Sequence, residues 1–143
     1  MESALTDFFR ALRAAGDDSF FHPHPLTDAE AGVRARYRGK DLYYVIVEQG
    51  EILGYGFLRG WDEGYEVPSL GIVIRPALRG AGLGRMLMHV LHQAARRHGA
   101  ARVRLRVLPK NAAARRLYED LGYIFETEEM GQRVGILELR RRV

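Results

Sequence analysis

The sequence contains no cysteine in its 143 residues, which excludes disulfide bonds, thiolate metal ligands and a cysteine nucleophile. It also lacks any apolar run near the roughly 18 residues of a transmembrane helix. The amino-terminal stretch MESALTDFFRALRAAGDD carries acids at a helical spacing, in place of the basic and apolar regions of a signal peptide. We therefore predict a single domain over residues 1–143 that is cytoplasmic and has no membrane partner.

Lysine is scarce, because Lys40 and Lys110 are the only two, and arginine supplies nearly all of the positive charge. The net charge of +4 favours anionic partners, which include nucleic acid, a membrane surface and a phosphorylated cofactor. The sequence has no basic stretch interleaved with aromatic residues and no recognised nucleic-acid module, so we do not expect a nucleic-acid partner. His89, His92 and His98 lack carboxylates at a useful spacing, and we predict no metal site.

Internal repeats and low-complexity segments are also missing, and the chain divides into helix-like and strand-like segments. Leu5, Phe8 and Leu12 recur at the spacing of an amphipathic helix. Two runs rich in β-branched and aromatic residues flank Gln49-Gly50 and indicate a hairpin. The predicted elements, in chain order, are a helix over 3–15, a helix from Thr27 or Asp28 to about Tyr37, a hairpin over 41–60, a strand over 65–76, a helix over 82–98, a strand over 101–109, a helix over 111–121 and a terminal hairpin over 123–143.

The two segments after the third strand show different periods. The helix over 82–98 is predicted to bury one apolar stripe, made of Leu83, Leu87, Val90, Leu91 and Ala94. The strand over 101–109 alternates valine and leucine with arginine, so one of its faces is predicted to be wet or to face a cofactor. Strands precede and follow the main helix, which predicts an α/β domain built in layers.

Glycine is concentrated in one short stretch, RPALRGAGLGRML over residues 75–87, which joins an apolar strand to a helix. Backbone N–H groups at a helix N-terminus are unpaired, and the helix dipole makes that end positive. Glycines allow an anionic group to approach the backbone, while Arg79 and Arg85 add donors suited to phosphate. The pattern predicts a turn that binds a pyrophosphate.

Two common phosphate-binding motifs do not match this turn. A dinucleotide-binding G-x-G-x-x-G would need glycine where Arg85 stands, and the G-x-x-x-x-G-K-[ST] of a Walker A loop is absent. The stretch Arg79-Gly80-Ala81-Gly82-Leu83-Gly84 instead resembles the [QR]-x-x-G-x-[GA] signature of the GNAT family, the GCN5-related N-acetyltransferases. A second stretch, NAAARRLYEDLGY, resembles another motif of that family. Its matching residues are Asn111, Ala114, Leu117, Tyr118, Gly122 and Tyr123.

The two motifs lie about 30 residues apart in family order, and the resemblance covers residues 42–140. It implies a GNAT-type acyl-CoA N-acyltransferase fold, an α/β fold whose central sheet is mixed, mostly antiparallel and flanked by helices on both faces. Family members usually begin with a strand before the first helix. Here the helical pattern starts almost at Met1, so that strand is either missing or displaced into residues 17–26.

The resemblance implies transfer of acetyl from acetyl-CoA to an amine by direct attack, with no acyl group held on the protein and no metal. In the family the glycine loop binds the pyrophosphate. This role falls here on Arg79, Gly80, Ala81, Gly82, Leu83, Gly84 and Arg85. The pantetheine arm would pair with the backbone of Ile72, Val73 and Ile74, where a backbone N–H would polarise the thioester oxygen.

Two residues of the second motif each have two interpretations. Tyr118 matches the family tyrosine that protonates the leaving thiolate, and its other interpretation is an aromatic residue packed under the cofactor. Asn111 matches the family asparagine near the pantetheine, and it is also a natural N-cap for the helix that follows.

The base that deprotonates the acceptor ammonium has several candidates. Glu66 opens the strand that carries the thioester site, where the family often places a base or relay. His22 and His24 titrate near neutrality and stand in FFHPHP, whose prolines stiffen a segment that lines the acceptor pocket in related folds. Asp62 and Glu63 lie just before Glu66, and solvated loop charges are the simpler interpretation of both.

We therefore predict an acetyl-CoA-dependent N-acetyltransferase whose acceptor is a small-molecule amine, an amino sugar included, or a peptide amine. The alternative is a non-catalytic acyl-CoA-binding module of the same fold, and a third hypothesis is a basic nucleic-acid-binding domain. An intact glycine loop and Tyr118 favour the enzyme. The sequence does not identify the acceptor. It does not define the oligomeric state either, and a homodimer is compatible with it.

Overall fold

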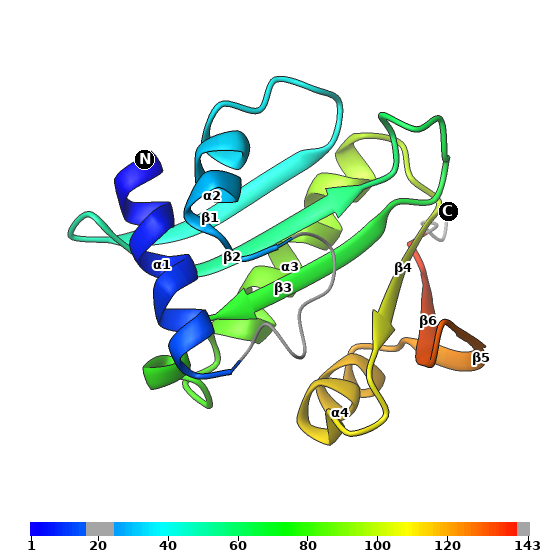
Figure 1. The fold of residues 1–143 in the computed structure, drawn as a ribbon. Helices are drawn as coiled ribbons and strands as arrows, with labels where there is room; N and C mark the ends of the chain where they lie inside the picture. Colours follow the sequence, from blue (N-terminus) through cyan, green and yellow to red (C-terminus); the bar gives the residue numbers. More distant parts are fainter. Residues whose placement is uncertain (17–24, 140–143) are drawn as a thin grey trace.

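The computed structural model describes residues 1–16 and 25–139. A six-stranded sheet in the order β1-β2-β3-β4-β6-β5 forms its centre (Figure 1). The strands are β1 Leu42–Glu48, β2 Glu51–Arg59, β3 Ser69–Ile74, β4 Arg102–Val107, β5 Ile124–Glu129 and β6 Gln132–Glu138. The helices are α1 Glu2–Ala14, α2 Asp28–Ala35, α3 Leu83–Arg97 and α4 Ala112–Asp120.

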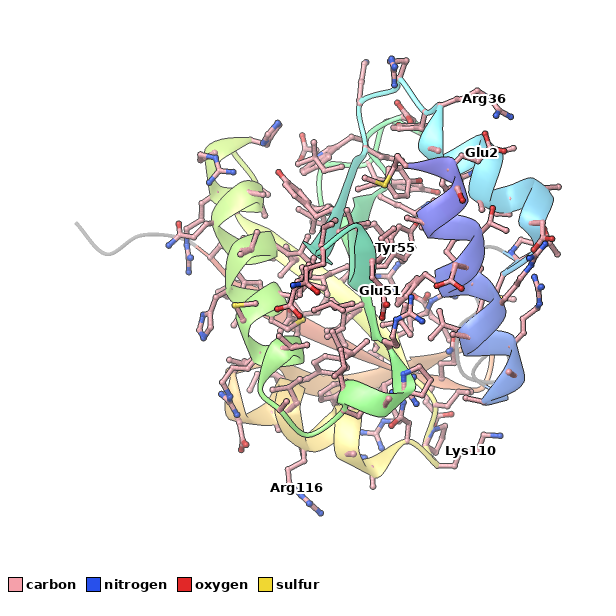
Figure 2. All side chains as sticks on the ribbon, turned by 90° about the vertical axis from the view of Figure 1, so that its left-hand side faces the viewer. Glu2, Arg36, Glu51, Tyr55, Lys110 and Arg116 are labelled. Carbon is pink, nitrogen blue, oxygen red and sulfur yellow. The ribbon has the colours of Figure 1, made fainter. Side chains whose placement is uncertain are left out.

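The sheet is mixed, because β3 and β4 run parallel while every other neighbouring pair is antiparallel. Figure 2 shows α1 and α2 on one side of the sheet and α3 on the other. The predicted α/β class, with a mostly antiparallel sheet between layers of helices, is confirmed. None of the helices in the described part of the chain is long and apolar enough to cross a membrane.

Two separate cores hold the helices to the sheet, one on each face. On the α1 side, Phe8, Phe9 and Leu12 are fully buried against strand residues that include Tyr55. On the α3 side, the helix packs closely on β2, since a Cβ at Gly56 would lie only 2.9 Å from the Leu91 Cδ1 atom. This packing holds α3, whose N-terminus follows the glycine turn, against β2.

The predicted elements match the observed ones, with two local corrections. Val90, predicted to be buried, is 43% exposed. Relative to the predicted stripe, the buried face of α3 is rotated so that Met88 and His92 are buried and Val90 is not. Its residues are Leu87, Met88, Leu91, His92, Ala94 and Ala95. The strand predicted over 65–76 begins only at Ser69, after Pro68, which has no N–H to donate to a ladder.

The amino terminus departs from the family pattern in the way that the sequence suggested. Residues 2–14 are helical, so no strand precedes α1 within the described amino-terminal segment. The sequence suggested that the missing strand could be displaced into residues 17–26. Residues 25 and 26 of this region are not part of a strand. Residues 17–24 lie outside the described part of the chain.

Candidate active site

The junction between β3 and β4 is the most open part of the sheet. Their only register pair is Ser69 with Arg104, and the Arg104 N–H donates to the Pro68 carbonyl at 3.0 Å. Beyond this point the two strands diverge (Figure 1). Among residues 1–16 and 25–139, the divergence leaves one edge of β3 without a neighbouring strand.

The hydrogen bonds on the other edge of β3 show which backbone groups face this opening. The Arg75 N–H donates to the Leu53 carbonyl on β2 at 2.8 Å. Because backbone groups alternate in direction along an antiparallel strand, Val73 also faces β2, whereas Ile72 and Ile74 face the opening. Of the three residues expected beside a pantetheine arm, two therefore present backbone groups to the divergence.

The glycine turn follows β3 through a short 3₁₀ turn over Pro76–Leu78. Gly80 and Gly82 have φ values of +85° and +86°, a left-handed conformation that favours glycine. A Cβ built on either glycine would have no heavy atom within 4 Å. These glycines thus allow the left-handed backbone conformation of the turn and leave its outer surface open. Core packing therefore does not account for them.

The turn ends at the N-terminus of α3, which has no side-chain cap. Gly82 is the N-cap, and the first helical bond runs from the Met86 N–H to the Gly82 carbonyl at 3.1 Å. The N–H groups of residues 83–85 therefore have no partner within the helix. The first turn contains no acid. A helix end with free donors and no acid suits an anionic ligand.

Two arginines flank this helix end. Arg79 donates from Nε and Nη2 to the Ile74 carbonyl, at 3.2 and 3.0 Å, so its guanidinium lies against the turn. Arg85 forms an exposed ion pair with Asp120 of α4 at 3.6 Å. Both charges stay close to the free N–H groups and add to the positive potential there.

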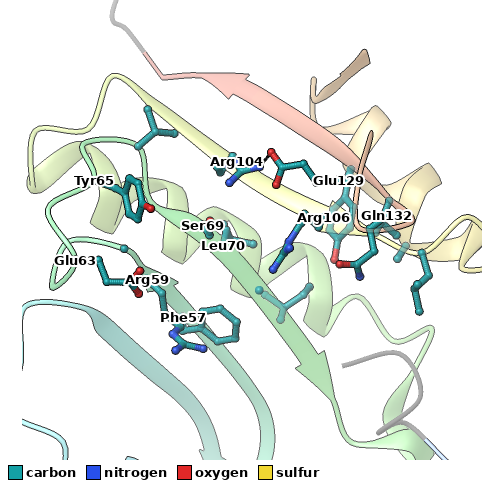
Figure 3. Close-up of a pocket in the computed structure, with 18 of the residues that line it drawn as sticks. Phe57, Arg59, Glu63, Tyr65, Ser69, Leu70, Arg104, Arg106, Glu129 and Gln132 are labelled. Atoms are coloured by element: carbon teal, nitrogen blue, oxygen red, sulfur yellow. Dashed lines mark hydrogen bonds and ion pairs between the residues drawn. The ribbon is translucent and has the colours of Figure 1, made fainter. Parts of the chain in front are cut away.

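Two clefts approach the β3–β4 divergence. The smaller, of about 580 Å³, runs from the glycine turn along β3 to α4. The larger, of about 890 Å³, is lined by the 60–67 loop, β3, β4 and the β5–β6 hairpin (Figure 3). Four residues line both clefts: Ile72, Asn111, Ala114 and Tyr118. The clefts therefore meet at this shared wall.

Tyr118 of α4 is 8% exposed and reaches the place where the clefts meet. Burial raises its pKa to about 12, so the hydroxyl stays protonated at neutral pH. Asn111 is the N-cap of α4, where its side chain accepts the Ala114 N–H at 3.3 Å. Its capping role is confirmed, and the same residue also lines both clefts.

The acids of the 60–66 loop occupy different environments. Glu63 and Glu66 line the larger cleft, and Glu66 precedes β3 by three residues, whereas the sequence placed it at the strand's start. Asp62 does not line it: the Tyr37 hydroxyl and the Lys40 N–H donate to its carboxylate, the latter at 2.7 Å. These bonds lower the pKa of Asp62 and give it a structural role. His22 and His24 lie outside the described residues.

Sequence inspection missed the residue that shapes this loop. Asp41, 8% exposed, accepts N–H groups from Gly60, Trp61 and Asp62 at 3.0, 2.8 and 3.2 Å. The carboxylate thereby satisfies three backbone donors in the loop that walls the larger cleft. An aspartate directly before a strand is an ordinary turn residue, so no local signal indicates this long-range role.

The comparisons agree with this geometry. The model of the acetyltransferase (GNAT) family matches residues 6–123, so the chain belongs to the GNAT acetyltransferase family. The resemblance found in the two motifs is confirmed, and the chain is an acetyltransferase by family. No match was found among curated protein sequences.

Solved structures share the fold at low sequence identity. The GNAT domain of S. lividans PAT gives a TM-score of 0.80 over 96% of this chain and 84% of that one, at 18% identity. A GCN5-related N-acetyltransferase from Kribbella flavida gives 0.76 over 96% and 91%, at 23% identity. The structure of yncA from Salmonella typhimurium with its cofactor acetyl-CoA gives 0.72 over 99% and 90%, at 22% identity.

Proposed function

We propose that this protein transfers the acetyl group of acetyl-CoA to a primary amine of a small molecule, an amino sugar included, or of a peptide, by direct attack in a ternary complex. One observation carries the proposal: two clefts reach the same segment of β3 and α4 from different sides. Such an arrangement allows two substrates to bind separately and to react where the clefts meet.

The smaller cleft has the features that acetyl-CoA requires. The free N–H groups at residues 83–85, with Arg79 and Arg85, would hold the pyrophosphate. The open left-handed glycines Gly80 and Gly82 leave room for it beside the backbone. The edge of β3 at Ile72 and Ile74 would pair with the pantetheine arm, and a backbone N–H of this edge would polarise the thioester oxygen.

Tyr118 would serve the leaving group. Its hydroxyl is protonated at neutral pH and lies at the junction of the clefts, so it can donate a hydrogen bond to the departing sulfur and supply a proton. Asn111 stays in place as the cap of α4 and orients the helix that carries Tyr118.

Glu66 is the base candidate within the described residues, because it lines the larger cleft. His22 and His24 remain the other candidates on the basis of sequence alone. In either case the role is to take one proton from the acceptor ammonium, which leaves a neutral amine able to attack the thioester carbonyl.

The test is an acetyl-transfer assay that follows thiol release and identifies the acetylated product by mass spectrometry over a panel of amines. We expect at least one amine to be acetylated, with kcat/KM reduced about 10-fold to 100-fold in Glu66→Gln. Glu63→Gln is the matched control, since it removes a charge from the same loop and the same cleft wall.

The alternative, a non-catalytic acyl-CoA-binding module, predicts a different pattern. Acetyl-CoA and CoA would raise the melting temperature while no amine in the panel became acetylated. A nucleic-acid-binding domain would instead be stabilised by DNA in a salt-dependent way and would not respond to CoA.

A further inference from the structure

The arginines of β4 differ in their partners, although they share one face of the strand. Arg102 donates to Glu138 and Arg104 to Glu129, each at 2.7 Å. Arg106 has no such pair: among the described residues no carboxylate lies within ion-pair distance of its guanidinium. Within the described residues, its side chain forms a 3.7 Å hydrogen bond to the Met130 sulfur, a weak acceptor.

Arg106 lines the larger cleft beside the reaction point. Arg106 lies two residues beyond the single register pair of Ser69 with Arg104, and it lines the same cleft as Gly71 and Ile72 of β3. Figure 3 shows its side chain across β3 from Glu63 and Arg59. Gln132, at the start of β6, lines the same cleft and carries an amide that can also donate.

The other charges of the cleft leave this position available for an anion. Glu129 is hydrogen-bonded and ion-paired to Arg104, which lowers the pKa of that carboxyl, while Arg106 contributes a weaker electrostatic attraction without an ion pair. Figure 3 shows Glu63 and Arg59 across β3 from Arg106, and Glu66, the base candidate, lines the same cleft. Arg106 is therefore an arginine of the cleft lining whose guanidinium forms no ion pair with the described residues.

We infer that the acceptor is an amine that also carries an anionic group, a carboxylate or a phosphate, and that Arg106 binds this group. The inference rests on the proposed acetyl transfer to an amine. A guanidinium binds either oxyanion through paired N–H donors, which would replace the weak bond to Met130. Arg106 would thereby determine specificity by orienting the acceptor amine towards the thioester.

The experiment compares acceptors that differ only in the anion. Each amino acid is assayed beside its amide, and glucosamine 6-phosphate beside glucosamine, with wild-type protein, Arg106→Gln and Arg102→Gln. Arg102→Gln is the matched control, because it loses the same charge from the same face of β4 and does not line the cleft. The two acceptors of a pair differ in the intrinsic reactivity of their amines. This difference cancels when the ratio of their kinetic constants is compared between variants and wild type.

We expect wild-type protein to prefer the anionic member of at least one pair. Arg106→Gln should raise KM for that acceptor by about 10-fold to 100-fold, as for loss of a hydrogen bond to a charged group, with kcat little changed. Its neutral partner should be acetylated as before, and Arg102→Gln should behave as wild type. The pair that responds distinguishes a carboxylate from a phosphate.

Two results would overturn the inference: a wild-type preference for neutral amines, or equal KM changes for both members of a pair in Arg106→Gln. A binding measurement separates this failure from failure of the proposed function. Calorimetric titration of the CoA-saturated protein with the N-acetylated amino acids and their amides reports anion binding without turnover. Arg106-dependent binding with no acetyl transfer would refute the proposed function alone, and absence of anion preference in binding would refute the inference alone.

Discussion

The two clefts are built from different materials. The smaller one offers backbone groups beside apolar side chains: the left-handed glycines, the N–H groups at the start of α3 and the edge of β3. The larger one is lined by side chains from a loop, from strands β2, β3 and β4, from α4 and from the β5–β6 hairpin, several of them charged. A backbone site requires particular residues at particular spacings, whereas a side-chain site can be assembled from residues far apart in sequence.

This difference decides what each cleft can reveal about its ligand. The glycine turn fits a generic anionic group and the backbone edge fits an amide-bearing arm, both independent of the acceptor. The larger cleft carries the charges that can discriminate among amines. We therefore expect variants on the two sides to separate cleanly, with effects on acetyl-CoA on one side and on the acceptor on the other.

The largest expected effect lies where the clefts meet. Tyr118→Phe keeps the ring and removes the hydroxyl, and kcat should fall by about 10²-fold to 10⁴-fold if this group protonates the leaving thiolate. Acetyl-CoA affinity, measured by calorimetry, should change little. Tyr123→Phe is the control, because its hydroxyl is bonded to His92 at 2.8 Å rather than placed at the junction. A decrease below about threefold, with chemistry rate-limiting, would leave Tyr118 as a packing residue.

The core on the α3 side should make stability depend on pH. Burial lowers the pKa of His92 to about 4, whereas an unfolded histidine has its ordinary value near 6.5. Between about pH 6.5 and pH 4 the unfolded state therefore binds more protons than the folded state. The free energy of unfolding should drop by about 3 kcal/mol as the pH falls through that window.

His92→Gln provides the comparison, since glutamine does not titrate and can still bond to the Tyr123 hydroxyl. Urea denaturation at pH 7 and at pH 4.5 should show a smaller loss of stability in the variant than in wild type. Equal losses in both proteins would mean that other groups cause the acid sensitivity.

On the backbone side, Gly82→Glu should abolish acetyl-CoA binding by placing a carboxylate at the expected pyrophosphate position. Acetyl-CoA at about 100 times its Kd should stabilise wild-type protein by about 2.7 kcal/mol, and this gain should vanish. Gly99→Glu is a matched control, because Gly99 has a φ of +81° and equally open surroundings at the other end of α3. Unchanged acetyl-CoA binding in Gly82→Glu would exclude the turn as the site.

The smallest expected effect concerns His22 and His24 of the segment FFHPHP. Replacing His22 and His24 with glutamine keeps hydrogen bonding and removes titration near neutrality. Acceptor KM or kcat should worsen by about tenfold, while acetyl-CoA binding stays unchanged. Wild-type kinetics in the double variant would leave Glu66 as the better base candidate.

The order and type of the described helices and strands could be predicted from the sequence, and so could the glycine turn. Periodicity fixed the elements, and the turn at Gln49-Gly50 has the positive φ values that its residues favour, +51° and +78°. The burial of Val90 was mispredicted because a stripe has a width that periodicity does not define. The angle at which α3 packs on the sheet determines which residues at the border of the apolar stripe are buried.

The charged lining of the larger cleft could not be predicted. The pairing of Arg104 with Glu129, and the lack of an ion pair at Arg106 within the described part of the chain, depend on how the β5–β6 hairpin lies beside β4. Asp41 gains its role from a loop about 20 residues further along the chain. Such relations are set by strand order and register, which local sequence patterns do not encode.

The single backbone pairing between β3 and β4 also divides the sheet into two units that are continuous in the chain. One contains β1, β2 and β3, the other β4, β5 and β6, and each is internally hydrogen-bonded along its length. Amide protons at Ile72 and Ile74 should therefore exchange with deuterium faster than that of Val73 between them. The two units can open as separate cooperative elements, and a ligand lying along the edge of β3 would couple them by protecting those amides.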